Sequence, residues 1–310
     1  MSKPVTTLTP VSQPCLPNSD DIQVPQVRNK FYSFGEWYIA CSEGPILPIL
    51  HHDKLEAELG LKCLPDMLFT DSLFSISLGS HNPKLTVSAP NIDKEKIPEF
   101  SINFNCKDAL KSIEKDNYKH LQVKSAKDWQ STRDIESAPI KDKGNWTFST
   151  TYRGTFESKS NISFQPTTMK IDYDRLKDQT KKIAFNEDIV LFEDEADDNG
   201  QMQLRLRFRV MQDCFFILLR NYIRIDGVII RLIETRIYHE SGTKHLIREK
   251  SYREIDWDKC SKHHLASNVR LQTQSVLYNP DILNFHLMSD DGFCKSVVTR
   301  DDKEIESLSW

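Results

Sequence analysis

Two long apolar runs between residues 215 and 240 form the clearest hydrophobic pattern in the chain. They are joined by Asp226-Gly227, and an Asp-Gly pair between segments rich in Ile and Val predicts a two-residue hairpin turn. A helix is the alternative, because part of the first run also fits a spacing of three and four residues, but the Asp-Gly break and the β-branched residues favour strands. In the predicted register Ile225 faces Val228. The expected core face consists of Phe215, Ile217, Leu219, Ile223, Ile225, Val228, Ile230 and Leu232.

A second pair of strands is expected just before this hairpin. Residues 188–195 and 203–211 flank Asn199-Gly200, which is another hairpin signal. In the second segment apolar residues at 204, 206, 208 and 210 alternate with Arg205, Arg207 and Arg209, the period of a half-buried strand. Residues 188–240 therefore predict a four-stranded antiparallel meander.

Shorter patterns predict the remaining elements of a mainly β fold. Strands are expected at 31–41, 73–78, 101–104, 146–155 and 161–164, and short helices at 51–59, 108–113 and 173–180. Gly60 follows the first of these helices, as is typical of a helix end. The polar segments 79–98 and 124–145 are expected to be loops.

The two ends of the chain have weaker patterns. Residues 1–29 hold five prolines among Ser and Thr, and such a composition buries too little surface to order itself, so we predict a disordered tail. After residue 255 the pattern becomes mixed and polar. We expect residues 256–310 to form a C-terminal extension that is partly disordered.

Composition places the chain among globular proteins without marked charge. Hydrophobic residues make up 38% of the 310 residues and the net charge is -4, which gives no general attraction to nucleic acid or acidic membranes. No apolar run reaches the roughly 18 residues of a membrane-spanning helix, and the first residues show no secretory signal. Seven scattered cysteines without a C-x-x-C pair then indicate reduced thiols in the cytosol or nucleus.

Two charged patterns suggest binding chemistry. The acidic run consists of Glu193, Asp194, Glu195, Asp197 and Asp198. It lacks the spacing of an EF-hand, so a solvated turn is favoured over a cation site. The arginine stripe consists of Arg205, Arg207, Arg209, Arg220, Arg224 and Arg231. Its guanidinium groups could bind phosphate or carboxylate, or nucleic acid less readily, unless the acidic run before them neutralises them.

Motifs for catalysis or metal binding are weak. Cys260, His263 and His264 make only half of a zinc site, and a surface cluster is the favoured interpretation. His239 and Glu240 resemble an acid/base pair, but neighbours in a strand point to opposite faces. The sequence has no nucleophile elbow, phosphate loop, dinucleotide fingerprint or H-E-x-x-H motif. We therefore predict a protein that is not an enzyme and needs no metal or cofactor.

Five segments carry a resemblance to a known family. They are Phe34-Gly35-Glu36-Trp37, LPDMLFTD at 64–71, WTFSTTYRGT at 146–155, LFEDEADDNG at 191–200, and FFILLRNYIRIDGVIIR through TRIYHE at 215–240. In their order and spacing they resemble the TOR signalling pathway regulator-like (TIPRL, or TIP-forty-one-like) family. The resemblance implies one such domain over residues 30–255, with a loop insertion at 79–98.

The resemblance also implies a fold and a function. The expected fold is mainly β (α+β), with two antiparallel β-sheets in a sandwich-like arrangement, a few short flanking helices, and a cleft suited to a phosphatase's C-terminal tail. The implied function is that of a non-enzymatic regulator in TOR signalling, which binds the catalytic subunit of protein phosphatase 2A and related phosphatases. Some members are linked to an alpha-four-type phosphatase-binding protein. The expected compartment is the cytoplasm and also the nucleus, without nucleic acid or membrane as a partner.

Partner-contact residues follow from the same resemblance. Asp108 and Ile171 match the family pattern, whereas Leu232 and Glu234 stand where the family often has methionine and aspartate. Arg236 also matches, and its guanidinium could hold a tail carboxylate. Asp108, at a predicted helix start, is expected to be exposed. The alternative function is a small-molecule phosphate-ligand-binding protein or hydrolase that uses the arginine-lined cleft.

Overall fold

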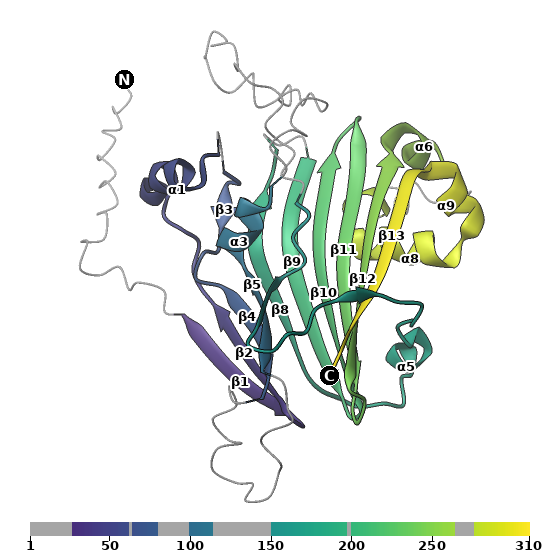
Figure 1. Ribbon diagram of the computed structural model, residues 1–310. Helices are drawn as coiled ribbons and strands as arrows, with labels where there is room; N and C mark the ends of the chain where they lie inside the picture. Colours follow the sequence, from purple (N-terminus) through teal and green to yellow (C-terminus); the bar gives the residue numbers. More distant parts are fainter. Residues whose placement is uncertain (1–26, 62–63, 80–98, 114–149, 197–199, 264–275) are drawn as a thin grey trace, which may run out of the picture.

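The computed structural model describes residues 27–61, 64–79, 99–113, 150–196, 200–263 and 276–310, and in this part the chain forms two antiparallel sheets that pack face to face (Figure 1). Short helices lie at the edges and on the outer face of the larger sheet. The predicted mainly β fold with two antiparallel sheets and short flanking helices is thereby confirmed. None of the helices in these ranges is long and apolar enough to cross a membrane.

The smaller sheet has the order β1-β2-β4-β5-β6. Its first two strands replace the single strand region expected at 31–41, because the chain reverses at Gly35, whose φ of +56° suits a residue without a Cβ. The strands are β1 (Arg28–Phe34), β2 (Trp37–Glu43), β4 (Leu73–Leu78), β5 (Phe100–Asn105) and β6 (Thr155–Ser158).

The larger sheet has the order β3-β8-β9-β10-β11-β12-β13-β7, and its six long strands follow one another along the chain. The predicted four-stranded meander is confirmed as β8 to β11, and two more strands extend it. The strands are β3 (Met67–Leu68), β7 (Gln165–Pro166), β8 (Ile183–Asp194), β9 (Gly200–Met211), β10 (Cys214–Ile225), β11 (Ile229–Glu240), β12 (His245–Asp256) and β13 (Val298–Ser309).

The predicted register of the central hairpin is wrong by one residue. Ile225 pairs with Ile229 rather than with Val228, so the loop has three residues, and its glycine has a φ of +75°. Side chains alternate between faces with period two, so a shift of one residue reverses the faces of the whole second strand. Ile230 and Leu232, expected in the core between the sheets, therefore lie on the outer face.

The main core fills the space between the two sheets. The alternation predicted for β9 is confirmed, since the apolar residues at 204, 206, 208 and 210 are buried and the three arginines point outward. Aromatic rings dominate this core, where Phe208 packs against Phe74 and Phe215 packs against Trp37. Its largest fully buried members are Trp37, Phe74, Phe104, Phe192, Phe208, Phe215, Ile39, Leu68 and Ile76.

The C-terminal part covers the outer face of the larger sheet at one end. Helices α6 (Trp257–Lys262), α8 (Pro280–Ser289) and α9 (Asp291–Val297) form this cap, seen in yellow and green in Figure 1. Leu283, Leu287 and Phe293 of the cap are buried together with Tyr222 and Leu232 of the sheet. The described part of residues 256–310 is helical and then supplies β13, which pairs with β12.

The shorter elements follow the sequence with some shifts. Helix α1 (His52–Leu59) ends at Gly60 as predicted, and α3 (Cys106–Lys111) and α5 (Tyr173–Lys177) replace the helices expected at 108–113 and 173–180. The strand expected at 146–155 is not found in residues 150–154, and that at 161–164 is replaced by the later β7. Residues 1–26, 80–98 and 114–149, with the predicted tail and loops, lie outside the described ranges, whereas residues 28 and 29 already belong to β1.

Candidate functional site

Three of the predicted contact residues lie in one row along β11. Leu232, Glu234 and Arg236 are two residues apart, so they all face outward from the larger sheet. All three are nevertheless buried, with exposed fractions of 1%, 1% and 6%. Leu232 packs beneath the cap, among the buried residues of α8 and α9. A partner cannot reach the side chains of Leu232 and Glu234 directly in this arrangement.

Glu234 and Arg236 belong to a buried ionic network across four strands. The Glu234 carboxylate accepts hydrogen bonds from Arg220 Nε, at 2.6 Å, and from Arg236 Nη2. Arg236 Nη1 donates to Glu249 Oε1 at 2.7 Å, and Lys303 Nζ lies 2.8 Å from Glu249 Oε2. Arg236 is thus engaged on both sides by carboxylates of its own chain, which leaves it poorly placed to hold a carboxylate from a partner.

Charge pairing sets the ionisation of this network. Burial alone would raise the pKa of Glu234, but the positive charges of Arg236 and Arg220 outweigh it, and the pKa lies below the ordinary value of 4.5. Burial alone would lower the pKa of Arg236, whereas Glu234 and other neighbours raise it. Glu234 and Arg236 are therefore both charged at neutral pH, and each charge has an opposite partner.

Ile171 lies beside this network and anchors α5 to the sheet. Its side chain is buried with Met211, Tyr238 and Ile247, where the outer face continues past the row on β11. Two residues later, the Tyr173 hydroxyl donates to Glu249 Oε1 at 3.0 Å. The segment that leads into α5 is therefore fixed to β11 and β12 by one apolar and one polar contact.

Asp108 is separated from the other four predicted residues. It lies in the first turn of α3, next to the smaller sheet, and helix residues on either side of it pack in the core between the sheets. The expectation that it is exposed is wrong: it is half-buried, and its carboxylate accepts hydrogen bonds from Thr155 Oγ1 at 2.7 Å and Asn105 Nδ2 at 2.9 Å. Burial raises its pKa, but these hydrogen bonds outweigh burial and the net pKa is lowered. Asp108 thereby ties α3 to β6.

A groove of about 540 Å³ lies on the outer face of the larger sheet, between α5 and α8. Its floor is formed by β8, β9 and β10, with the apolar side chains of Phe216 and Leu218 exposed to it. Leu176 of α5 and Met288 of α8 form apolar parts of the two walls. Of the predicted contact residues, Arg236 lines this groove.

The groove carries an excess of positive charge. Lys177, Arg207, Arg209 and Arg236 line it together with the carboxylate of Asp188, whereas the Glu187 side chain points to the opposite face of β8, toward Lys30. Arg209 and Lys177 are both exposed, and neither has an ion-pair partner among the described residues. Within the described ranges the structure thus singles out two cations of the groove without an ion-pair partner: Arg209, which the sequence alone did not distinguish from the rest of the arginine stripe, and Lys177, which lies outside the stripe.

Most of the arginine stripe is neutralised, though not by the acidic run. Arg205 and Arg207 contact Asp188 of β8, and Arg207 and Arg220 both contact Asp281 at the start of α8. These pairings remove most of the basis for the alternative function, a site for a phosphorylated small molecule.

The acidic run is in part a buried turn. Asp194 is 1% exposed, and its carboxylate accepts hydrogen bonds from the backbone N–H groups of Ala196, at 2.6 Å, and Asp66, at 3.1 Å. The favoured prediction of a solvated turn is therefore wrong for Asp194. Asp197 and Asp198 lie outside the described residues.

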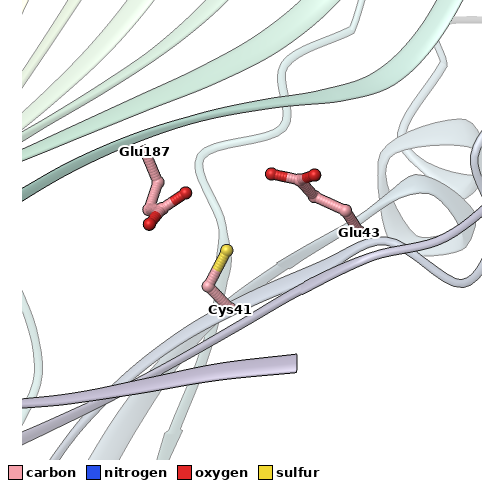
Figure 2. Close-up of side chains that lie close together, drawn as sticks. All are labelled: Cys41, Glu43 and Glu187. Carbon is pink, nitrogen blue, oxygen red and sulfur yellow. The ribbon is translucent and has the colours of Figure 1, made fainter. Parts of the chain in front are cut away.

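Cys41, Glu43 and Glu187 point toward one another where β2 meets β8 (Figure 2). No pattern in the sequence indicates this cluster, because its members come from different sheets. Lys30 Nζ donates to Glu187 at 2.6 Å and lies 3.8 Å from Glu43, so an ammonium group of the chain already neutralises these carboxylates. Burial and the two carboxylates raise the pKa of the Cys41 thiol to about 11, which keeps it protonated. The arrangement is that of an ion pair and not of a metal centre.

The other proposed sites have structural explanations. Cys260 is buried in the cap with a pKa raised to about 12 by burial, and His263 packs against Phe293, while His264 lies outside the described residues. His239 faces the core between the sheets, whereas Glu240 pairs with Arg175 at 2.9 Å. The two do not act as an acid/base pair, as the alternation predicted.

Comparisons with known proteins match most of the chain. The sequence model of the TIP41-like family matches residues 89–261. A human protein named TIP41-like protein is 36% identical over 277 residues, which cover 88% of this chain and 91% of the human one, and the rat protein of that name is 33% identical over the same shares. A protein of the fission yeast Schizosaccharomyces pombe, named Type 2A phosphatase activator tip41, is 30% identical over 74% of this chain and 84% of its own length.

Proposed function

The chain belongs to the TIP41-like family, and on that premise we propose that it regulates a type 2A protein phosphatase by binding the catalytic subunit, within TOR signalling and without catalysing a reaction. Relatives in fission yeast and budding yeast are named type 2A phosphatase activators, which supports a phosphatase as the partner. Related phosphatases and an alpha-four-type protein are further candidate partners, and the cytoplasm and nucleus are the proposed compartments.

The groove between α5 and α8 is the surface that supports this proposal. An extended, acidic C-terminal tail of the phosphatase would lie along its apolar floor, with its negative charge attracted by the positive excess of the lining. Extended peptides commonly bind in such grooves, where apolar contacts provide affinity and charges provide selectivity. The body of the phosphatase would then rest on the surface around the groove.

The residues expected at the contact serve this groove indirectly. Leu232 packs beneath α8, which forms one wall, and Ile171 anchors the segment that leads into α5, which forms the other. Arg236 and Glu249 hold the same segment through Tyr173. These positions therefore control the distance and orientation of the two walls, and substitutions there would change partner binding without a direct contact.

Titration calorimetry of this chain against a purified phosphatase 2A catalytic subunit, with and without its C-terminal tail, tests the proposal. We expect binding that weakens when the tail is removed. Leu218→Glu should produce a similar loss, because it places a negative charge on the half-buried floor of the groove. Leu73→Glu is the matched control, since Leu73 is 38% exposed on the smaller sheet, away from the groove.

The possible results separate the partner from the mode of binding. Absence of binding to either form of the catalytic subunit would contradict the proposed function. Equal binding to both forms would keep the phosphatase as the partner but exclude the groove as the site for its tail. A phosphatase activity assay in the same samples decides whether the complex is activated or inhibited.

A further inference from the structure

We propose that Arg209 and Lys177 form an anion subsite in the groove, and that this subsite selects the partner segment by the side-chain carboxylate of an acidic residue. The inference rests on the proposed function, because it names the chemistry by which the same groove recognises its peptide. It assigns the electrostatic contact to two residues for which neither the family resemblance nor the comparisons give a role. It also removes Arg236 from that contact.

The pairing of the other cations leads to these two residues. Arg207 has both Asp188 and Asp281 as partners, with 2.7 Å from its Nη1 to Asp281 Oδ1. Arg236 is enclosed by Glu234 and Glu249 in the buried network. A carboxylate that approached either arginine would have to displace a carboxylate already in contact, at the cost of an existing charge-assisted hydrogen bond.

A carboxylate that binds Arg209 and Lys177 would not have to displace another carboxylate. In the described part of the chain neither has an ion-pair partner, and both are exposed while they line the groove. They come from different elements, Arg209 from β9 and Lys177 from the end of α5, so they can reach a ligand from the floor and from one wall. An arginine fork together with a mobile ammonium suits a carboxylate that lies between them.

A second observation indicates a peptide rather than a free anion. The Oδ1 atom of Asn284, on the α8 wall, is buried and has no hydrogen-bond partner among the described residues. Because this atom is closed off from solvent, the half-buried side chain of Asn284 would have to rotate before its oxygen could accept a hydrogen bond from a backbone N–H of an extended segment. Between the two polar ends lie the apolar side chains of Phe216 and Leu218, so the expected segment has an acidic residue near α5 and apolar residues toward α8.

The groove has a carboxylate of its own, but it does not pair with Arg209 or Lys177. Asp188 of β8 lines the groove, and Asn186 on the same face of this strand pairs with Arg209 across the sheet. Asp188 is already paired with Arg205 and Arg207, so it leaves the charges of Arg209 and Lys177 available to a ligand. Side chains line the groove, whereas a chain-end carboxylate is typically held by backbone N–H groups, so we assign the carboxylate to an acidic side chain.

Fluorescence anisotropy with a labelled peptide of the phosphatase tail, measured on the full chain, tests the subsite. We expect Arg209→Gln and Lys177→Gln each to weaken binding about tenfold, the loss typical of one charge-assisted hydrogen bond. Arg205→Gln is the matched control, because Arg205 belongs to the same stripe and strand but is paired with Asp188 and does not line the groove. It should bind the peptide as the unchanged protein does.

Changes in the peptide identify the carboxylate. A peptide with its acidic residues replaced by their amides should bind the unchanged protein about as weakly as the Arg209→Gln variant binds the original peptide. A peptide with lysine at the acidic position should recover affinity with Arg209→Glu, a rescue that a merely structural role for Arg209 would not produce. If amidation of the peptide's C-terminus removes the effect of Arg209 instead, the assignment to a side chain is overturned.

The outcomes keep this inference apart from the proposed function. If the unchanged protein binds the phosphatase, and the Arg209 and Lys177 variants bind it equally well, the subsite is refuted and the proposed function stands. An equal loss in Arg205→Gln also refutes the subsite, because it shows a general effect of positive charge. If the unchanged protein binds neither the phosphatase nor its tail peptide, the proposed function itself fails.

Discussion

Replacement of Glu234 by glutamine tests whether a residue expected at the partner contact acts by holding the sheet together. The side chain of Glu234 is fully buried and accepts hydrogen bonds from Arg220 and Arg236. Glutamine keeps the size and one acceptor oxygen but removes the charge. The two arginines would then face an uncharged group, with only their second partners, Asp281 and Glu249, to compensate them.

The magnitude follows from the cost of leaving buried charge unpaired. Removal of one partner from a buried ion pair costs about 3–5 kcal/mol, and the two remaining carboxylates place this site near the lower end, at about 3 kcal/mol. For a domain of this size each kcal/mol lowers the midpoint of thermal unfolding by about 2–4 °C. We therefore expect Glu234→Gln to unfold at a temperature lower by about 6–12 °C.

Urea unfolding followed by tryptophan fluorescence and circular dichroism measures this loss. Glu304→Gln is the control, because Glu304 lies 2.6 Å from Arg153 but its side chain is 59% exposed, and such a surface pair contributes less than about 1 kcal/mol. If Glu234→Gln costs no more than this control, the network does not stabilise the sheet as argued. If the variant is fully folded and still fails to bind the phosphatase, Glu234 contacts the partner more directly than its burial indicates.

Acid should remove the same stabilisation. The pKa of Glu234 is lower in the folded protein than its ordinary value of 4.5, because the charges of Arg236 and Arg220 outweigh burial. The pKa of Glu249 is also lowered, because the hydrogen bond from Lys303 and the charge of Arg236 outweigh burial. A carboxyl group with a lowered pKa stabilises the fold above the unfolded-state pKa, and this contribution is lost as pH falls through the folded-state pKa. Unfolding free energy should therefore decrease below pH 4.5, and less steeply in Glu234→Gln than in the unchanged protein.

Three further predictions concern stability. Gly154→Ala should cost several kcal/mol of unfolding free energy, because Gly154 has a φ of +89° and an added Cβ would lie 2.7 Å from the Phe104 ring. Gly242→Ala, with a φ of +83° and open space around it, should cost only about 1–2 kcal/mol. Equal urea midpoints for the two variants would refute the expected clash with Phe104. Leu283→Ala in the cap should cost about 2–5 kcal/mol in urea unfolding, because Leu283 is fully buried, and a loss below 1 kcal/mol would show that the cap is loosely packed. Burial lowers the pKa of His239 below 6.5. The neutral ring therefore stabilises the fold above pH 6.5, and this contribution is lost as pH falls through the lower pKa of the folded state. Urea midpoints at pH 7 and pH 5 should differ more in the unchanged protein than in His239→Asn.

The groove could not be derived from the sequence, although its components could be noticed there. The alternation along β9 placed Arg205, Arg207 and Arg209 on the outer face, and the structure confirms this. Which of them is free depends on Asp188 and Asp281, and the second of these is more than seventy residues away in the chain. Ion pairing across such separations leaves no local pattern, so three arginines that look equivalent in sequence differ in their ion pairs.

The sequence by itself determined the elements whose signal is local. Period-two alternation with turn residues located β8 to β11, and the glycine after α1 located the end of that helix. Asp226-Gly227 also located the hairpin, but the pattern did not show whether the loop has two or three residues. A two-residue and a three-residue loop both leave apolar residues on each face of the sheet, so the pattern alone could not determine the register of β11 against β10.

The register of this hairpin depends on tertiary contacts, because the cap forms a second layer over the outer face of the larger sheet. The cap covers Tyr222, Ile230 and Leu232, so that the larger sheet is buried on both sides at this end and either register would bury apolar side chains. The sequence pattern did not predict β13, because most of its residues are exposed and polar. Backbone pairing with β12, rather than burial of an apolar face, holds this strand in place. Local periodicity thus fixes which segments become strands, whereas contacts between distant segments fix their register, their partners and the groove they form.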